Sequence, residues 1–247
     1  MNRIKSGILG LDKLIQGGIP CRSSVLVCGG PGTGKSIFGL QFLYQGAMNG
    51  ENGLYVTIEE KPINLKQQAR QFGMDFNRFN SRINFLKIPV DMSNFDIFSA
   101  IRSASRKVKA KRIVIDSLSI MAINASMYKL PVKVRTRTKW EIHELQPSSL
   151  GGEFEMQQFI YILISRIMGL GATCLFISDS APGTRYLTRD SVSEFACDSV
   201  LQLKMMEMGK TVYRTLQVRK MRKTNIEPGL QMMHFGRRGM HISGFEY

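Results

Sequence analysis

The chain contains the stretch Gly29-Gly30-Pro31-Gly32-Thr33-Gly34-Lys35-Ser36, which matches the pattern G-x-x-x-x-G-K-S. The apolar run 24–28 precedes it and predicts a buried strand, while residues 37–44 follow with apolar side chains at helical spacing. In such a strand–loop–helix arrangement, glycines let backbone N–H groups surround phosphate oxygens, and the helix dipole favours their negative charge. The stretch therefore predicts a nucleoside triphosphate site.

Two side chains of this loop have separate predicted roles. Lys35 is expected to reach the β- and γ-phosphates, and the Ser36 hydroxyl is expected to bind Mg²⁺. The alternative is a glycine-rich turn with a chance lysine, but eight matched positions between a strand and a helix argue against it. The expected nucleotide-binding residues are Gly29, Gly30, Pro31, Gly32, Thr33, Gly34, Lys35, Ser36 and Ile37.

Strand-like and helix-like patterns alternate along most of the chain. This alternation predicts an α/β fold of the P-loop type, with a mostly parallel central sheet flanked by helices. From residue 199 onward, short runs around Gly209, Gly236 and Gly239 predict antiparallel hairpins that extend the sheet. No repeat or linker is visible, so we expect a single domain over residues 1–247. The expected strands are 24–28, 54–58, 83–86, 112–116 and 173–177, and the expected helices are 6–15, 64–71, 95–107 and 153–170.

The composition narrows the class of partner. The chain has 34 Lys and Arg residues against 19 Asp and Glu, which gives a formal net charge of +15. Such a charge favours polyanionic partners, with nucleic acid first among them. A basic surface that only keeps the protein in solution is an equal alternative.

Cysteine spacing and hydropathy bear on the compartment. The cysteines at 21, 28, 174 and 197 show no C-x-x-C spacing, which predicts free thiols in a reducing environment. The N-terminus lacks the apolar stretch of a signal peptide. The most apolar segment, 159–178, is interrupted by Arg166, Gly169 and Gly171, so it does not read as a membrane span. We therefore expect a cytoplasmic protein.

Three carboxylates directly follow predicted strands. Asp116 ends the run 112–116, where a second magnesium-orienting group of a P-loop enzyme is expected. Glu59 and Glu60 follow the strand 54–58, and one of two adjacent carboxylates there can face the pocket and polarise a water molecule. The simpler alternatives are a turn-capping aspartate and two surface glutamates before a Lys-Pro turn.

Further motifs are distributed over the whole chain. They are SGILGLD at 6–12, GGIP at 17–20, QFLY at 41–44, VTIEEKP at 56–62, FGMD at 72–75, IDS at 115–117, GAT at 171–173, EF at 194–195, Asp198 and KMR at 220–222. Together with the phosphate loop they resemble the KaiC-like branch of the RecA-superfamily ATPases. That branch includes the circadian-clock protein KaiC and archaeal RadA-paralogue proteins.

The resemblance implies a RecA-like core that assembles into rings, commonly hexamers, with ATP between neighbouring subunits. It implies that Glu59 and Glu60 are the catalytic glutamates, and that Lys220 and Arg222 reach the γ-phosphate held by the next subunit. A cation supplied by another chain stabilises the charge that develops in the transition state. Two more residues of the same segment are implied to join the nucleotide-binding set, Met221 and Thr224.

The segment around residues 219–224 has another interpretation and one departure. Without the resemblance, its charges read as those of a basic edge strand that discourages aggregation. The family usually has glycine where this chain has Lys223.

The stretch 128–152 is longer than its counterpart in KaiC, and we expect it to form an inserted loop. It follows the Asp116 strand, where recombinases of the wider superfamily carry their first DNA-binding loop. Trp140 lies within it and could stack on a base or anchor a core. A solvated insertion, or one that binds a protein, is the alternative. The candidate nucleic-acid contacts are Lys133, Arg135, Arg137 and Lys139, which recur at every second position, and Arg185 and Arg189, at the place of the second such loop.

These observations favour an ATP-binding, Mg²⁺-dependent ATPase that forms a ring and acts with DNA. A second hypothesis is a signalling or scaffold module in which ATP controls assembly with protein partners. A third is an autokinase like the clock protein, which carries two such domains in tandem where this chain has one.

Overall fold

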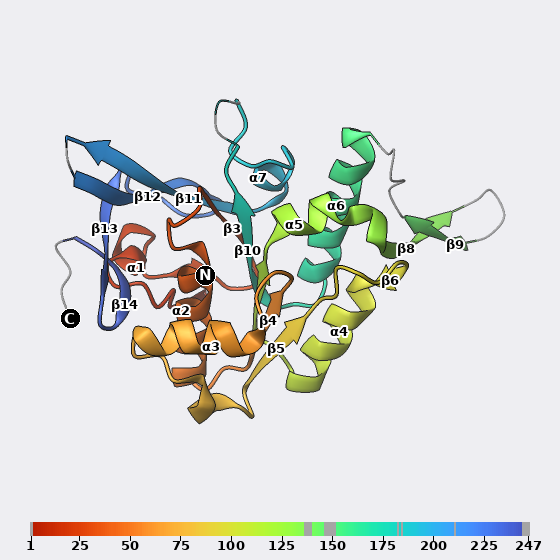
Figure 1. The fold of residues 1–247 in the computed structure, drawn as a ribbon, viewed down its shortest axis with the longest axis horizontal. Helices are drawn as coiled ribbons and strands as arrows, with labels where there is room; N and C mark the ends of the chain where they lie inside the picture. Colours follow the sequence, from red (N-terminus) through yellow and green to blue (C-terminus); the bar gives the residue numbers. More distant parts are fainter. Residues whose placement is uncertain are drawn as a thin grey trace.

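In the computed structural model, residues 2–135, 140–145, 152–181, 183, 185–209 and 211–243 are described, with the backbone alone at 131–135, 140–145 and 208. Within these residues the chain forms a nine-stranded sheet in the order β14-β13-β12-β11-β3-β10-β7-β4-β5 (Figure 1). The six strands from β11 to β5 are parallel, and β12, β13 and β14 continue the sheet in antiparallel fashion. The predicted α/β architecture with C-terminal antiparallel hairpins is thereby confirmed. The strands are β3 Ser24–Gly29, β4 Gly53–Thr57, β5 Ile83–Lys87, β7 Arg112–Asp116, β10 Thr173–Asp179, β11 Ser199–Met208, β12 Thr211–Met221, β13 Gln231–Gly236 and β14 Gly239–Ile242.

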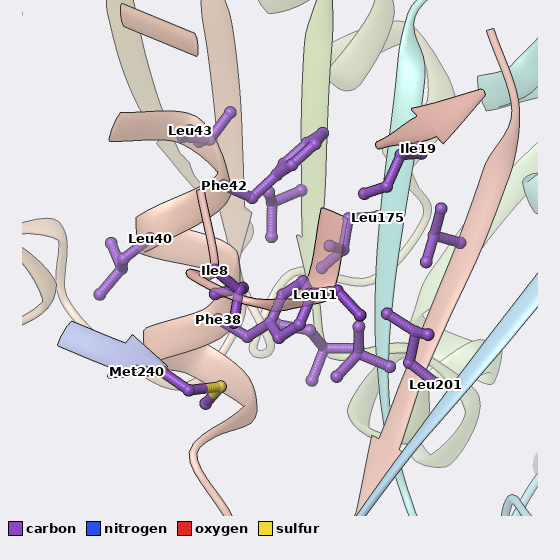
Figure 2. Close-up of a cluster of buried hydrophobic side chains, with 14 of the residues drawn as sticks. Ile8, Leu11, Ile19, Phe38, Leu40, Phe42, Leu43, Leu175, Leu201 and Met240 are labelled. Carbon is purple, nitrogen blue, oxygen red and sulfur yellow. The ribbon is translucent and has the colours of Figure 1, made fainter. Parts of the chain in front are cut away.

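Helices cover both faces of this sheet. Alternate side chains of each strand point to opposite faces, so Val25 and Val27 of β3 join one buried cluster while Leu26 and Cys28 join the other. The first cluster lies under α2 and α3, and Figure 2 shows Phe38 and Phe42 of α2 among its members. The second lies under the helices on the other side. The helices are α1 Leu11–Leu14, α2 Lys35–Met48, α3 Pro62–Gln71, α4 Ile97–Val108, α5 Leu118–Ile123, α6 Glu153–Met168 and α7 Ser193–Ala196, with 3-10 turns at Phe76–Phe79 and Ala125–Met127.

Two small sheets accompany the main one. β1 (Arg3–Ile4) pairs with β2 (Ile19–Pro20) in antiparallel fashion. In the stretch expected to be inserted, β8 (Tyr128–Arg135) and β9 (Trp140–Leu145) form an antiparallel pair, and β8 also pairs with β6 (Phe95–Asp96). Figure 1 shows this hairpin projecting beyond α5 and α6.

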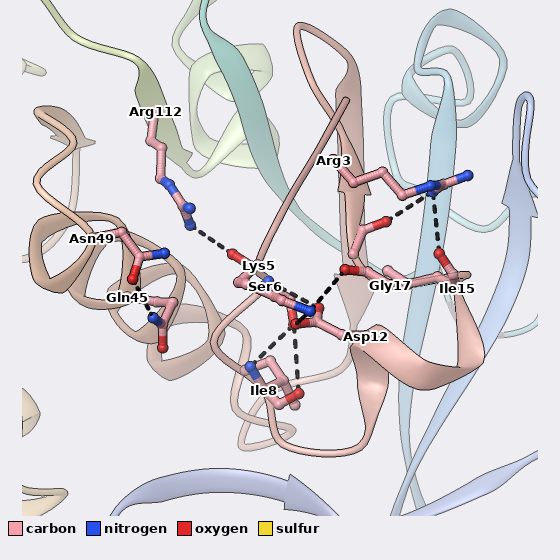
Figure 3. Close-up of polar contacts among 11 residues, drawn as sticks. Arg3, Lys5, Ser6, Ile8, Asp12, Ile15, Gly17, Gln45, Asn49 and Arg112 are labelled. Atoms are coloured by element: carbon pink, nitrogen blue, oxygen red, sulfur yellow. Dashed lines mark hydrogen bonds and ion pairs between the residues drawn. The ribbon is translucent and has the colours of Figure 1, made fainter. Parts of the chain in front are cut away.

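The helix expected at 6–15 is the largest departure from the predicted elements. Only Leu11–Leu14 are helical, because Gly7 and Gly10 adopt φ values of 83° and 88°. The Ser6 N–H instead donates to Asp12 Oδ1 at 2.9 Å, which folds the segment into a turn (Figure 3).

Two other expectations concern thiols and membranes. All four cysteines are free, as predicted; Cys28, Cys174 and Cys197 are buried and Cys21 is half-buried. Among the described residues, no helix combines the length and apolarity needed to cross a lipid bilayer.

A buried arginine holds together the end of the sheet where β7 begins. Arg112 is 1% exposed, and its Nε lies 2.5 Å from Glu51 Oε2. Its Nη1 donates to the carbonyl of Lys5 at 2.8 Å (Figure 3). The same nitrogen donates to the Phe42 carbonyl, also at 2.8 Å. Burial lowers the pKa of Arg112, and Glu51 opposes that shift. One guanidinium thus ties β7 to the N-terminal segment, α2 and the turn after α2.

We expect Glu51→Gln to lower the free energy of unfolding by about 3 kcal/mol, the low end for a broken buried pair because Glu51 is partly exposed. The substitution keeps the side-chain volume but leaves the buried guanidinium without a counter-charge. Urea unfolding followed by circular dichroism measures the change. The exposed Glu227→Gln is the control and should stay within about 0.5 kcal/mol of wild type; equal stabilities for both variants would contradict the prediction.

Candidate functional site

The phosphate loop connects the end of β3 to the start of α2. Gly32 and Gly34 adopt φ values of 73° and 100°, a region that glycine enters without steric cost. At Gly34 space is also limiting, since a Cβ atom would lie 2.4 Å from Cζ of Phe235. The Thr33 hydroxyl donates to the Gly30 carbonyl at 2.8 Å and closes the loop. The predicted strand–loop–helix arrangement is therefore present.

Lys35 turns its ammonium group into this loop. Its Nζ donates to the carbonyls of Gly29 and Gly30, each at 2.9 Å, and lies 3.1 Å from Asp179 Oδ1. Asp179 was not among the predicted site residues. It is the last residue of β10, and its signal was a carboxylate shortly after the strand expected at 173–177.

Ser36 and Asp116 are adjacent, as their shared predicted role requires. Ser36 Oγ donates to Asp116 Oδ2 at 2.7 Å, and Tyr55 Oη donates to the same oxygen at 2.6 Å. Burial raises the pKa of Asp116, while the hydrogen bonds from Tyr55 and Ser36 oppose the rise. Tyr55 is a second residue that the sequence reasoning missed. It lies inside β4, on the face of the sheet covered by α2, and its pKa is raised well above the usual value, mainly by burial.

The donor set of Ser36 and Asp116 fits Mg²⁺. Both offer hard oxygen atoms, and Mg²⁺ in phosphate-transferring sites is usually held by one or two side chains together with substrate phosphates and water. A dedicated cage of many protein ligands is not required.

Glu59 and Glu60 follow β4 at the same edge of the sheet, because Thr57 pairs with Asp116. Burial raises the pKa of Glu59, and the negative charges of Asp116 and Asp179 raise it further. Glu60 is held differently, since its Oε1 accepts from Gln68 Nε2 of α3 at 3.2 Å. Glu59 is therefore the glutamate whose pKa is raised by the other carboxylates of the site.

A cavity of about 440 Å³ adjoins the phosphate loop. Phe72 and Phe235 form an aromatic wall with their ring centroids 5.8 Å apart, and the Arg214 guanidinium lies 5.1 Å from the Phe235 centroid. Arg214 Nε also donates to the Gly32 carbonyl at 3.2 Å. Of the predicted residues, Gly32, Gly34, Lys35, Ser36 and Ile37 line this cavity, whereas its aromatic wall was not predicted.

Lys220 and Arg222 lie away from the phosphate loop of their own chain. Met221 pairs with Ser199, and Ser199 pairs with Val25, four residues before Gly29 in β3. At about 3.3 Å per residue this places the segment roughly 13 Å back along the strands. Met221 itself is buried.

Contacts within the chain also fix the Lys220 side chain. Its Nζ donates to the carbonyls of Glu194, Phe195 and Cys197 at 3.3, 3.5 and 2.7 Å. Burial lowers its pKa, and the neighbouring Arg222 lowers it further. Arg222 is exposed.

The nucleic-acid candidates are only partly described. Arg137 and Lys139 lie outside the described residues, as do the side chains of Lys133, Arg135 and Trp140, whose backbone belongs to β8 and β9. After β10, Arg185 and Arg189 are both exposed, and the Arg189 N–H donates to the Asp179 carbonyl at 3.3 Å.

Comparisons with known proteins show the family of the chain. A family model described as "ATPase: KaiC" covers residues 4–136 and 141–246. The chain belongs to the KaiC family of ATPases. A UPF0273 protein of Pyrococcus furiosus is 31% identical over 244 residues, covering 91% of this chain and 87% of the relative. A UPF0273 protein of Methanocaldococcus jannaschii is 33% identical over 246 residues, covering 91% and 89%.

A solved structure also shows that the fold is that of the family. The crystal structure of a KaiC-like protein from Pyrococcus horikoshii matches with a TM-score of 0.79 at 30% identity, over 98% of both chains. The resemblance seen in the motifs is thereby confirmed, and the fold is that of a KaiC-like, RecA-superfamily P-loop ATPase.

The backbone conformation at Lys223 explains why glycine is the usual residue at this position in the family. Lys223 adopts a φ of 59°, a region that glycine tolerates and other residues enter at a cost. Arg3 holds the turn from outside, because its Nη2 donates to the Lys223 carbonyl at 3.2 Å and to Thr224 Oγ1 at 3.0 Å. The same guanidinium donates to the carbonyls of Ile15 and Gly18 (Figure 3).

Lys223→Gly should raise the free energy of unfolding by roughly 0.5–1 kcal/mol, because relief of the left-handed strain exceeds the entropy that glycine adds to the unfolded chain. Lys66→Gly, inside α3, is the control of opposite sign and should cost about 1 kcal/mol. Chemical denaturation of both variants measures the effect. A loss of stability in Lys223→Gly would show that the turn is not strained.

Proposed function

We propose that this chain is a Mg²⁺-dependent ATP hydrolase that works as a ring, with hexamers as the expected form, and acts with DNA. Membership of the KaiC family supports the ATPase part. The observation that carries the proposal is the juxtaposition of the phosphate loop, Lys35 and the Ser36–Asp116 pair at one edge of the sheet. These are the groups needed to hold a triphosphate and its metal.

Lys35 is positioned to exchange protein partners for phosphate oxygens. In the structure its charge is met by two carbonyls and by Asp179. The phosphates of ATP carry more negative charge than these partners. The amides of the loop add hydrogen-bond donors beyond those of the lysine. Asp179 then acts as a placeholder that keeps the ammonium group oriented before the nucleotide binds.

Ser36 and Asp116 would hold Mg²⁺, which neutralises phosphate charge when it is bound. Tyr55 orients the Asp116 carboxylate through its hydrogen bond to Oδ2. The raised pKa of Asp116 means that acid removes this ligand at a higher pH than for an ordinary aspartate.

Glu59 is the best placed general base. A base works best when its pKa lies near the working pH, and burial with neighbouring carboxylates moves the pKa of Glu59 upward. Glu60 supports the strand end through its bond to Gln68. The aromatic cavity formed by Phe72 and Phe235 lies beside Ser36 and Ile37, where it offers an apolar surface for the nucleotide base.

The positions of Lys220 and Arg222 support action between chains. Met221, which lies between them, is roughly 13 Å back along the strands from its own phosphate loop, a position that favours action on a γ-phosphate of another chain. Met221 and Thr224 would accompany them to the neighbour's nucleotide. This position is our reason for proposing a ring.

The proposed link to DNA rests on charge. The net charge of +15, the exposed Arg185 and Arg189 and the basic run 133–139 all favour a polyanion. Four phosphate contacts by the run 133–139 would give a slope of about −3 to −4 in log K against log salt.

Two substitutions separate binding from hydrolysis. Lys35→Ala should abolish measurable binding of Mg-ATP in titration calorimetry, because the loop loses its only cation. Glu59→Gln should keep the affinity while ATP turnover falls by about 10²–10⁴-fold, the usual contribution of a general base. The exposed Glu207→Gln should change neither property. The proposal fails if the wild-type protein takes up no ATP or ADP with Mg²⁺ present.

Mixing two inactive variants tests the ring. Arg222→Ala should lower turnover by about 10³–10⁵-fold, as removal of an arginine finger does in other nucleotidases. A mixture of Arg222→Ala and Lys35→Ala should regain activity, because some contacts then combine an intact loop with an intact finger. A mixture as inactive as its components would show that the finger does not act between chains. Light scattering of each variant with ATP reports assembly independently.

A further inference from the structure

A second cavity of about 540 Å³ adjoins the phosphate loop and shares no lining residue with the aromatic one. Its walls come from the loop itself, from residues 180, 181 and 185–187 after β10, and from β11 and β12. Its volume lies in the range of pockets that bind small molecules or single units of a polymer. Arg185 and three residues of the phosphate loop have roles above, but the cavity that they line with β11 and β12 has none.

The charged side chains of the described residues that line this cavity are all basic. Among the described residues, Arg185, Lys204 and Arg219 line the cavity and no carboxylate does. All three are exposed, and none forms an ion pair with a described residue. Arg219 has one neutral partner, Gln217 Oε1, at 3.3 Å from its Nη1. Three cations around one hollow favour an anion such as a phosphate.

A buried amide marks the cavity independently of the charge. Gln202 lies in β11, lines the cavity and is only 7% exposed, yet its Oε1 has no hydrogen-bond partner among the described residues. A buried acceptor without a partner costs free energy, so a ligand that donates an N–H group here recovers it. Tyr186 also lines the cavity and supplies an aromatic ring.

We propose that this cavity binds one nucleotide unit of a single-stranded nucleic acid, a proposal that rests on the DNA-linked function above. The three cations take the phosphate, Tyr186 stacks on the base, and Gln202 Oε1 accepts an N–H from the base edge. A single strand fits this chemistry because its bases are free to stack on an aromatic side chain and to present their edges. In a duplex both are occupied by the neighbouring base pairs and the partner strand.

Occupancy of this cavity is coupled to the nucleotide site. Gly30, Pro31 and Thr33 form walls of the cavity and are also part of the phosphate loop. From the other side, Asp179 pairs with Lys35 and immediately precedes the segment that carries Arg185 and Tyr186. A strand bound here therefore changes the affinity for ATP, and ATP changes the affinity for the strand by the same factor.

Fluorescence anisotropy of the full-length protein tests the proposal, with labelled 20-residue oligothymidylate and oligouridylate as probes in the presence of Mg-ATP. Both bases offer an N–H at the edge that Gln202 would read. Lys204→Gln and Arg219→Gln should each weaken binding and make the slope of log K against log salt shallower by about 0.7. Tyr186→Ala should weaken binding by roughly 5- to 100-fold, whereas Tyr186→Phe should bind as wild type does. Gln202→Leu should also weaken binding.

Controls separate the alternatives. Lys107→Gln removes an exposed charge from α4 and should bind both probes like wild type. Binding by Lys204→Gln, Arg219→Gln and Tyr186→Ala that equals wild type would overturn the proposal. So would altered ATP-dependent assembly with unchanged oligonucleotide affinity, because the cavity would then be a contact between copies of the chain. Calorimetry with Mg-ATP on the same samples shows whether a failure belongs to this cavity or to the ATP site.

Discussion

The hydrogen bond from Ser36 Oγ to Asp116 Oδ2 joins two segments that only the parallel sheet brings together. β10 lies between their strands, and its register pairs Asp179 with Gly29 and Ile177 with Asp116. The contact between Lys35 and Asp179 and the bond from Tyr55 to Asp116 depend on the same register. A slip by one residue would turn a strand residue such as Asp116, Asp179 or Tyr55 to the opposite face of the sheet. The site is therefore as well defined as the pairing of β3, β10, β7 and β4.

β7 carries an ionisable group at each end, Arg112, which is buried, and Asp116, which is half-buried, and their surroundings differ. At its start, Arg112 has a carboxylate partner, two carbonyl acceptors and the ring of Phe42, 4.6 Å from its guanidinium carbon. At its end, Asp116 is met by two neutral hydroxyl donors, and burial raises its pKa. Arg112 has its charge matched by Glu51, although its Nη2 has no hydrogen-bond partner among the described residues. A carboxylate left short of positive charge is suited to receive a cation.

The sequence predicted five of the six parallel strands to within two residues at each end, because apolar runs bounded by polar residues carry that signal locally. It predicted the phosphate loop for the same reason. The sixth parallel strand, β11, was expected only as part of an antiparallel hairpin, but it also pairs in parallel with β3. The sequence failed where a backbone torsion decides the outcome, as at Gly7 and Gly10, and where an element is as short as α5. Asp179 and Tyr55 were missed because their importance arises from neighbours on other strands, at Lys35 and Asp116. Periodicity along one strand holds no information about such neighbours.

Asp179 connects the two cavities through its present partner. If Lys35 exchanges Asp179 for phosphate oxygens, as we propose, the Asp179 carboxylate loses its counter-charge. Its negative charge already raises the pKa of Glu59. The cations nearest along the chain are then Arg185 and Arg189, in the segment that begins directly after Asp179. Attraction between them and the released carboxylate would draw that segment toward the phosphate loop. Nucleotide binding would thus reshape the wall of the second cavity through charge alone, without any change in the register of the sheet.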